Sequence, residues 1–111
     1  MDEIMKLEAG RKLDALVAEK VMGFSDVHEH IYSSGEKQWV HGDFRSLPRF
    51  STDISDAWKV VEKFIEGEFP IDCELHTTVM GWYCDLGDGS ANAETAPLAI
   101  CRAALNNNPE S

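Results

Sequence analysis

The spacing of apolar side chains changes once along the middle of the chain, and this change limits the folds open to it. From Ile54 to Ile65 the apolar residues recur every three or four positions, which is the period of an amphipathic helix. Over Ile71 to Leu86 they recur at every second position, which is the period of strands with one buried face. The chain therefore combines helices with a small sheet.

Two helices are predicted before this sheet. The first runs from about Asp2 to Met22, is weakened at Gly10 and stops at Gly23. The second follows three consecutive candidate N-caps, Ser51-Thr52-Asp53, and ends near Gly67. Its apolar stripe includes Trp58, so we expect the Trp58 side chain in the core.

The alternation predicts an antiparallel meander followed by a last helix. Its strands lie near Ile71–Thr78, Gly81–Leu86 and Ser90–Glu94, with a turn signal at Gly87-Asp88-Gly89. Thr95 is placed to cap the final helix, and its buried stripe comprises Leu98, Cys101, Ala104 and Leu105 before Asn106-Asn107-Asn108-Pro109 ends it.

With 111 residues, the chain is expected to form one domain around one core. Residues 24–50 are interpreted as an irregular, loop-rich segment in which only Lys37–His41 has the composition of a short strand. The expected architecture is α+β, a three-layer α/β/α sandwich whose small antiparallel sheet is covered by helices. The strand alternation predicts that one face of the sheet is better buried than the other.

Three segments, in this order, resemble the phage ABA sandwich domain. They are Ala9–Gly23, Leu47–Ile54 continued by Ala57-Trp58, and Glu94–Leu105. The resemblance implies a three-layer fold and a phage or prophage origin, and it implies no reaction. Phe24–Ser46 matches poorly, so a function residing in that segment would not carry over from the family.

The formal net charge of −10 disfavours nucleic-acid binding, because most of the surface should repel a phosphate backbone. The acidic residues are scattered, which favours solubility over DNA mimicry as their role. Met1–Gly10 contains four charged residues and does not resemble a signal peptide, and no stretch is long enough to span a membrane. An odd number of cysteines, Cys73, Cys84 and Cys101, favours a reducing compartment and buried thiols. We expect a cytoplasmic protein without a membrane partner.

Two features are candidates for binding an anion. The helix opening at Ser51-Thr52-Asp53 has free backbone N–H groups, although simple capping is favoured because Asp53 adds a negative charge where a phosphate would sit. Arg102 lies beside the buried stripe of the last helix. It either pairs with a carboxylate such as Asp14, Asp53 or Glu94, which we favour, or clamps a phosphate-bearing ligand.

Aromatic side chains near loops can stack on a planar ligand as readily as they fill a core, and here they are Trp39, Phe44, Trp82 and Tyr83. Neighbouring strand residues point to opposite faces, so Trp82 and Tyr83 should not share an environment. The candidate ligand-binding residues are therefore Ser51, Thr52, Asp53, Trp82, Tyr83, Thr95 and Arg102.

No catalytic or metal constellation is apparent. The tract His28-Glu29-His30, with Asp26 nearby, lacks further ligands at a regular spacing, and the three cysteines fall on apolar faces. We expect no metal, no cofactor and no enzymatic activity.

The leading hypothesis is a phage-encoded binding protein that captures a small nucleotide-derived host immune signal, as a counter-defence protein. The alternative is an acidic protein that binds and blocks a host protein, as an inhibitor or a DNA-mimic decoy. Surplus aromatic residues and an incompletely covered sheet favour a homo-oligomer, with a dimer as the expected form.

Overall fold

The computed structural model describes residues 8–43, 45–66, 73–87 and 89–107. Within these ranges it has three helices and two antiparallel sheets of three strands each. In chain order the elements are α2 (Arg11–Lys20), β1 (His28–Ile31), β2 (Lys37–His41), β3 (Arg45–Ser46), α3 (Ile54–Ile65), β4 (Glu74–Thr78), β5 (Gly81–Asp85), β6 (Ser90–Ala93) and α4 (Ala96–Asn107).

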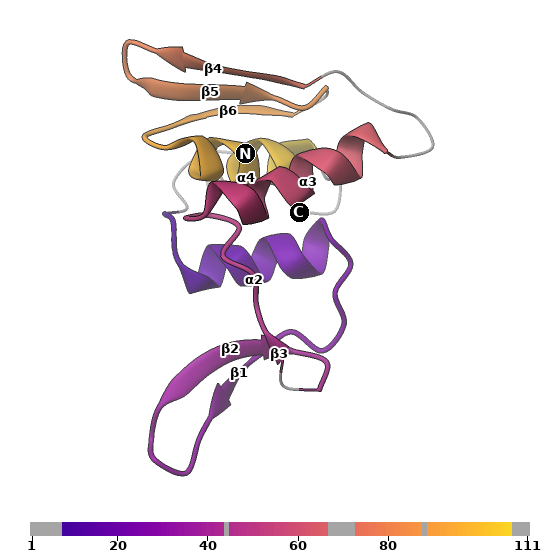
Figure 1. Ribbon diagram of the computed structural model, residues 1–111, viewed down its shortest axis with the longest axis vertical. Coiled ribbons are helices and arrows are strands. Elements are labelled where there is room, and N and C mark those ends of the chain that lie inside the picture. The colour runs from indigo at the N-terminus through magenta and orange to yellow at the C-terminus, as the bar shows by residue number, and fades with distance from the viewer. Residues whose placement is uncertain (1–7, 44, 67–72, 88, 108–111) are drawn as a thin grey trace.

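The two sheets lie at opposite ends of the molecule with the helices between them (Figure 1). The sheet β4–β5–β6 packs on α4, which in turn contacts α3 and α2. The sheet β1–β2–β3 lies beyond α2 and contacts it through β2. The α+β class and the antiparallel meander covered by helices are confirmed. Among the described residues, the helical cover of β4–β5–β6 lies on one face.

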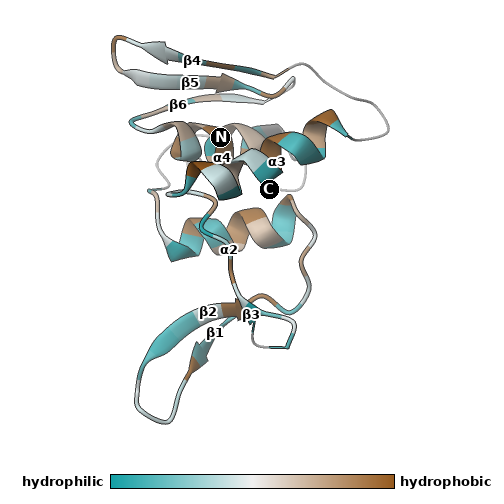
Figure 2. Cartoon of the chain, viewed as in Figure 1, coloured by the Kyte–Doolittle hydropathy of each residue, from teal (hydrophilic) through white to brown (hydrophobic). Residues whose placement is uncertain are grey.

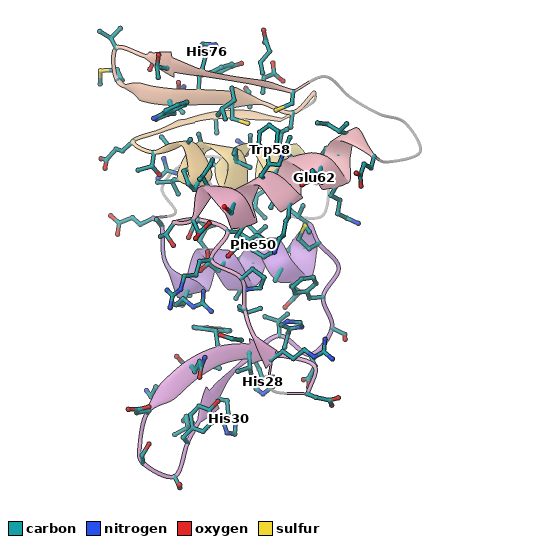
Figure 3. The ribbon with its side chains drawn as sticks, in the orientation of Figure 1. His28, His30, Phe50, Trp58, Glu62 and His76 are labelled. Carbon is teal, nitrogen blue, oxygen red and sulfur yellow. The ribbon has the colours of Figure 1, made fainter. Side chains whose placement is uncertain are left out.

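Small side chains let α4 approach the sheet closely. Ala91 and Ala93 of β6 are buried, as are Ala99, Ala103 and Ala104 of α4. Larger apolar residues fill the space around this contact, and Phe50 lies fully buried between α2 and α3 (Figure 3). The core is therefore built around α4. None of the described helices is long and apolar enough to cross a membrane.

Helix α3 follows the predicted pattern. Asp53 is its N-cap, and the Asp53 carboxylate accepts hydrogen bonds from the backbone N–H groups of Ser55 at 2.8 Å and Asp56 at 3.2 Å. The helix buries Ala57, Val60 and Val61. The predicted end near Gly67 lies outside the described residues.

The placement of Trp58 in the core is wrong. Its side chain is 46% exposed, whereas Ala57 and Val61 on the same helix are fully buried. The stripe that includes Ile54, Trp58 and Ile65 is displaced from the buried face by a fraction of a turn. Helical spacing alone did not separate these two adjacent faces.

The first helix is shorter than predicted within the described residues, because it begins only at Arg11. Gly10 has a φ of 153°, a conformation that favours glycine and that interrupts a helix. The end near Gly23 is confirmed, since the N–H of Phe24 folds back to the carbonyl of Ala18 at 2.8 Å. Residues 2–7 of the predicted helix lie outside the described ranges.

Residues 24–50 contain more sheet than the sequence predicted. The strand Lys37–His41 is confirmed as β2, but β1 and β3 were missed. Strand β1 reads His-Glu-His-Ile, so it carries no apolar alternation, and β3 has two residues. In the turn that closes the hairpin, the Tyr32 N–H donates to the carbonyl of Glu36 and the Gly35 N–H donates to the carbonyl of Tyr32, both at 2.8 Å. Gly35 has a φ of 92°.

Candidate functional site

Ser51 is part of a buried hydrogen-bond network that joins α2 to the segment before α3. The Ser51 backbone N–H and hydroxyl both donate to Asp14 Oδ1, at 2.8 and 2.6 Å, and the Gly10 N–H donates to Ser51 Oγ at 2.9 Å. Asp14 also accepts from Arg11 Nη1 at 2.8 Å. The donors of Ser51 are therefore used within the protein.

Thr52 and Asp53 complete the start of α3 as a capped helix. The Asp53 carboxylate occupies the position that an anionic ligand would take at the first free N–H groups. Thr52 is exposed, and its backbone N–H donates to the carbonyl of Arg49 at 3.2 Å. Capping, which the sequence favoured here, is the role that this geometry shows for Asp53.

Thr95 and Arg102 line one cavity of about 440 Å³ at the N-terminus of α4. The Thr95 hydroxyl accepts from the N–H of Leu98 at 3.4 Å, and Arg102 Nη1 donates to the carbonyl of Asn92 at 3.1 Å. Ser51, Thr52 and Asp53 do not line this cavity, although its lining residue Ala9 directly precedes Gly10. Thus the structure brings together two of the seven candidate residues.

Gly81 directly follows Met80, one of the residues that line this cavity. A Cβ atom at position 81 would collide with the carbonyl oxygen of Ala93, and Gly81 has a φ of 135°. The strands β5 and β6 therefore approach closely here, which fixes the backbone beside Arg102.

Trp82 and Tyr83 face opposite sides of β5, as predicted, and neither lines the cavity of Arg102. Trp82 is paired with the buried Ala93 and packs on the core. Tyr83 is paired with the exposed Asn92, and its ring lies 5.1 Å from that of His76 on the outer face (Figure 3). Tyr83 also donates to Asp85 Oδ2 at 3.4 Å.

The cysteines are free and are poor nucleophiles. Burial raises the pKa of the Cys84 thiol to about 12, and burial also raises the pKa of the Cys101 thiol. The pKa of Cys73 is also raised, chiefly by burial, although the hydrogen bond with Cys84 opposes the shift. Because the thiolate is the reactive form, none of the three is activated at neutral pH.

The two histidines of β1 lie on the sheet β1–β2–β3 (Figure 3). Their ring centroids are 6.4 Å apart, and His28 Nδ1 lies 2.9 Å from the carbonyl oxygen of Asp26. The described residues contain no group of three or more histidine, cysteine, aspartate or glutamate side chains arranged to hold a metal ion.

Sequence reasoning missed the role of Asp14. Its carboxylate is fully buried between the apolar residues Leu13 and Ala15, and Arg11 pairs with it across one helical turn. The i, i+3 spacing of Arg11 and Asp14 was the available signal, because an acidic residue on the apolar face of a helix needs such a partner.

Taken together, the fold and its cavities define a small α+β protein with recessed polar surfaces. The chain belongs to the Phage ABA sandwich domain family, whose pattern matches residues 15–105. The family description names a fold and phages, and it names no reaction.

A solved structure with the same fold is a phage protein from Bacillus cereus ATCC 14579. The two chains superpose with a TM-score of 0.63 at 24% sequence identity, over 91% of this chain and 93% of the other. A comparison with curated proteins gives no match.

Proposed function

We propose that this chain is a non-enzymatic, phage-encoded protein that captures a small nucleotide-derived ligand in the cavity at the N-terminus of α4. The observation that carries the proposal is that Thr95 and Arg102, singled out separately in the sequence, line one cavity. Its volume of about 440 Å³ lies within the range usual for small-molecule sites.

The charges around this cavity favour a ligand that is both acidic and rich in hydrogen-bond donors. The Arg102 guanidinium and the positive end of the α4 dipole attract an anionic group. Glu8 and Glu94 also line the cavity, and their carboxylates can only accept hydrogen bonds when ionised. A nucleotide-derived molecule supplies phosphate together with hydroxyl and amino donors, so it suits this set better than inorganic phosphate.

Apolar side chains complete the lining and support the same ligand class. Met80 and Leu98 contribute apolar surface to the cavity. A flat base can pack against such surface while its polar edge is hydrogen-bonded. Membership of a phage family makes a host immune signal the natural ligand of this class, and counter-defence the corresponding role.

The test is mass spectrometry of small molecules released by denaturing protein purified from infected, defence-active cells. We expect a nucleotide-derived molecule from the natural chain and none from Arg102→Ala, with the melting temperature close to that of the natural chain. The matched control is Arg45→Ala, which removes an exposed arginine far along the chain from this cavity and should retain the ligand. Unchanged retention in Arg102→Ala, with a lowered melting temperature, would assign Arg102 to the scaffold and overturn the proposal.

A second candidate function, binding to a host protein, is favoured by the turn between β4 and β5. Val79 is fully exposed there and Met80 is 85% exposed. Exposed apolar residues at a hairpin tip are suited to insertion into a pocket on another protein. A pull-down from host cells separates the two functions, because Val79→Ser changes a residue outside the cavity lining and should release a protein partner while a bound small molecule stays in place.

The expected homo-oligomer is also a proposal, and the exposed face of α3 supports it. Ile54, Trp58 and Ile65 lie on one stripe of that helix and are each between 42% and 49% exposed. A second copy of the chain could cover this stripe, since apolar helix faces commonly pair in symmetric dimers. Light scattering at micromolar concentration tests it, and a strict monomer would remove the proposal.

A further inference from the structure

Two hollows meet at Trp39, on the side of α2 that faces the sheet β1–β2–β3, away from the cavity of Arg102. One is polar, has a volume of about 470 Å³, and is lined in part by Arg11, Lys37, Trp39 and Arg49. The other has a volume of about 400 Å³ and is lined in part by Ala15, Leu16, Val27 and Trp39. The indole of Trp39 is thus shared between a charged hollow and an apolar one.

Arg11 is held in place on the wall of the polar hollow. Its Nη1 donates to Asp14 at 2.8 Å and to the carbonyl of Pro48 at 3.3 Å, and its Nη2 donates to the carbonyl of Leu47 at 2.8 Å. A guanidinium has five N–H donors, so these three bonds fix the group and leave two donors for a ligand. The side chain is 26% exposed, which keeps it accessible from the hollow.

Arg49 is anchored through its backbone and extends an exposed side chain into the same lining. Its N–H donates to Asp56 Oδ2 at 2.8 Å, and its carbonyl accepts from Thr52 and Asp53. Within the described residues, neither the Arg49 guanidinium nor the Lys37 ammonium forms a recorded ion pair. Both charges are available to an incoming anion.

The charge balance of the polar hollow limits the kind of anion. Asp14 neutralises Arg11, and Glu29 and Glu36 line the hollow together with Arg49 and Lys37. A dianion would be repelled by the two glutamates, whereas a single negative charge can compete with the glutamates for the arginines. This balance favours a carboxylate, sulfonate or phosphodiester over a phosphate monoester.

The apolar hollow accounts for the other half of the ligand. Trp39 is half-buried and packs on the core, which fixes its ring, and Leu16 is 36% exposed on the face of α2 beside it. A rigid aromatic wall next to exposed aliphatic surface binds flat apolar groups.

We propose that these joined hollows form a second binding site, for a small amphipathic monoanion. Its acid group lies against Arg11, Arg49 and Lys37, and its flat apolar part lies along Trp39 toward Leu16. The site lies partly in residues 24–46. It is independent of the nucleotide-derived ligand proposed for the cavity of Arg102.

The test uses two probes that differ by one sulfonate group. Anilinonaphthalenesulfonate carries one sulfonate, and phenylnaphthylamine is the same ring system without it. Each is titrated into the full chain while fluorescence and the three tryptophan indole N–H resonances are recorded, with the Trp39 resonance assigned by Trp39→Phe. We expect saturable binding of the sulfonate at one site, with the largest resonance shift at Trp39.

The variants separate this site from unspecific apolar binding. Arg49→Gln should weaken sulfonate binding about tenfold by removing a charge-assisted hydrogen bond, and should leave phenylnaphthylamine binding unchanged. Arg45→Gln removes a nearby charge outside the lining and should leave both unchanged, as should Arg102→Ala. Equal sulfonate binding by Arg49→Gln and the natural chain, or a largest shift at Trp58 or Trp82, would overturn the site. Tighter binding of naphthyl phosphate than of naphthalenesulfonate would overturn the preference for a monoanion.

Discussion

The two sheets of this molecule have the same number of strands and are held by very different amounts of core. In β4–β5–β6, the side chains of Cys84, Ala91 and Ala93 are buried under α4. In β1–β2–β3, Val40 alone among the strand residues is buried, and the sheet is largely hydrophilic (Figure 2).

The sheet β4–β5–β6 therefore belongs to the core, whereas the sheet β1–β2–β3 is held mainly by the segments that connect it to the rest of the chain. Leu47 and Phe50 are buried just after β3 and anchor the segment that follows the sheet β1–β2–β3. Sheets with few buried apolar contacts open at a lower free energy than the global unfolding. The proposed amphipathic site therefore lies on the less stable part of the molecule, where a ligand would also order the sheet.

The largest expected effect is at the hydrogen-bond network around Asp14, which joins the segment after β3 to α2. Asp14→Ala removes the acceptor for Ser51 and Arg11 and leaves the buried Ser51 N–H without a partner. We expect a loss of about 3–5 kcal/mol in the free energy of unfolding, measured by urea denaturation. Asp53→Ala, which removes only a helix cap, is the control and should cost about 1 kcal/mol. Equal losses would show that the network does not fasten the two regions.

A matched pair of isoleucines compares the two regions directly. Ile100 of α4 is fully buried in the core, and Ile31 of β1 is 61% exposed. Ile100→Ala should cost about 2–5 kcal/mol, because it leaves a cavity. Ile31→Ala should change stability by no more than about 0.5 kcal/mol. Similar losses in the two variants, measured by urea denaturation, would contradict the division of the core.

The rate at which the cysteines react with a thiol reagent reports how readily the sheet β4–β5–β6 opens. The raised pKa values of Cys84 and Cys101 predict that iodoacetamide at pH 8 labels the partly exposed Cys73 first, as read by mass spectrometry. Ile100→Ala should accelerate labelling of Cys84, while Val40→Ala in the sheet β1–β2–β3 should not. Faster labelling in Val40→Ala would mean that the two sheets open together.

The raised pKa of Cys84 also has a consequence for stability at alkaline pH. The unfolded thiol ionises near its ordinary pKa of 9.0, and the folded thiol ionises at about 12. The stability that the neutral buried thiol contributes is therefore fully present below pH 9 and is lost as the pH rises toward 12.

The sequence predicted helix α3 and the sheet β4–β5–β6 well and the sheet β1–β2–β3 poorly, for a physical reason. In helix α3 and in the strands β4 and β5 the side chains that pack on the core, such as Val61, Leu75 and Trp82, are apolar, so they repeat with the period of the element. Strand β1 buries almost nothing and is positioned by the turn at Gly35, which leaves no such pattern. The same limit applied to the candidate sites, because Thr95 caps the helix that carries Arg102, whereas Arg11 and Arg49 meet only in the fold.

A small change is also expected at Trp58, where helical spacing predicted the wrong environment. With 46% of the side chain exposed, Trp58→Ala should lower the stability of the monomer by about 1 kcal/mol, rather than the 3–5 kcal/mol typical of a fully buried tryptophan. Trp82→Ala is the matched control, because Trp82 of β5 packs on the core, and this substitution should lower the stability by more than Trp58→Ala does.

Protein concentration decides whether this estimate for Trp58 is complete. If a second copy covers the stripe of Ile54, Trp58 and Ile65, the melting temperature of the natural chain rises with concentration, because association stabilises only the folded form. Trp58→Ala should then abolish that dependence while changing the melting temperature of the dilute protein little. A natural chain whose melting temperature does not vary with concentration would leave the exposed face of α3 without a second copy. A loss above about 3 kcal/mol in the dilute variant would instead return Trp58 to the core.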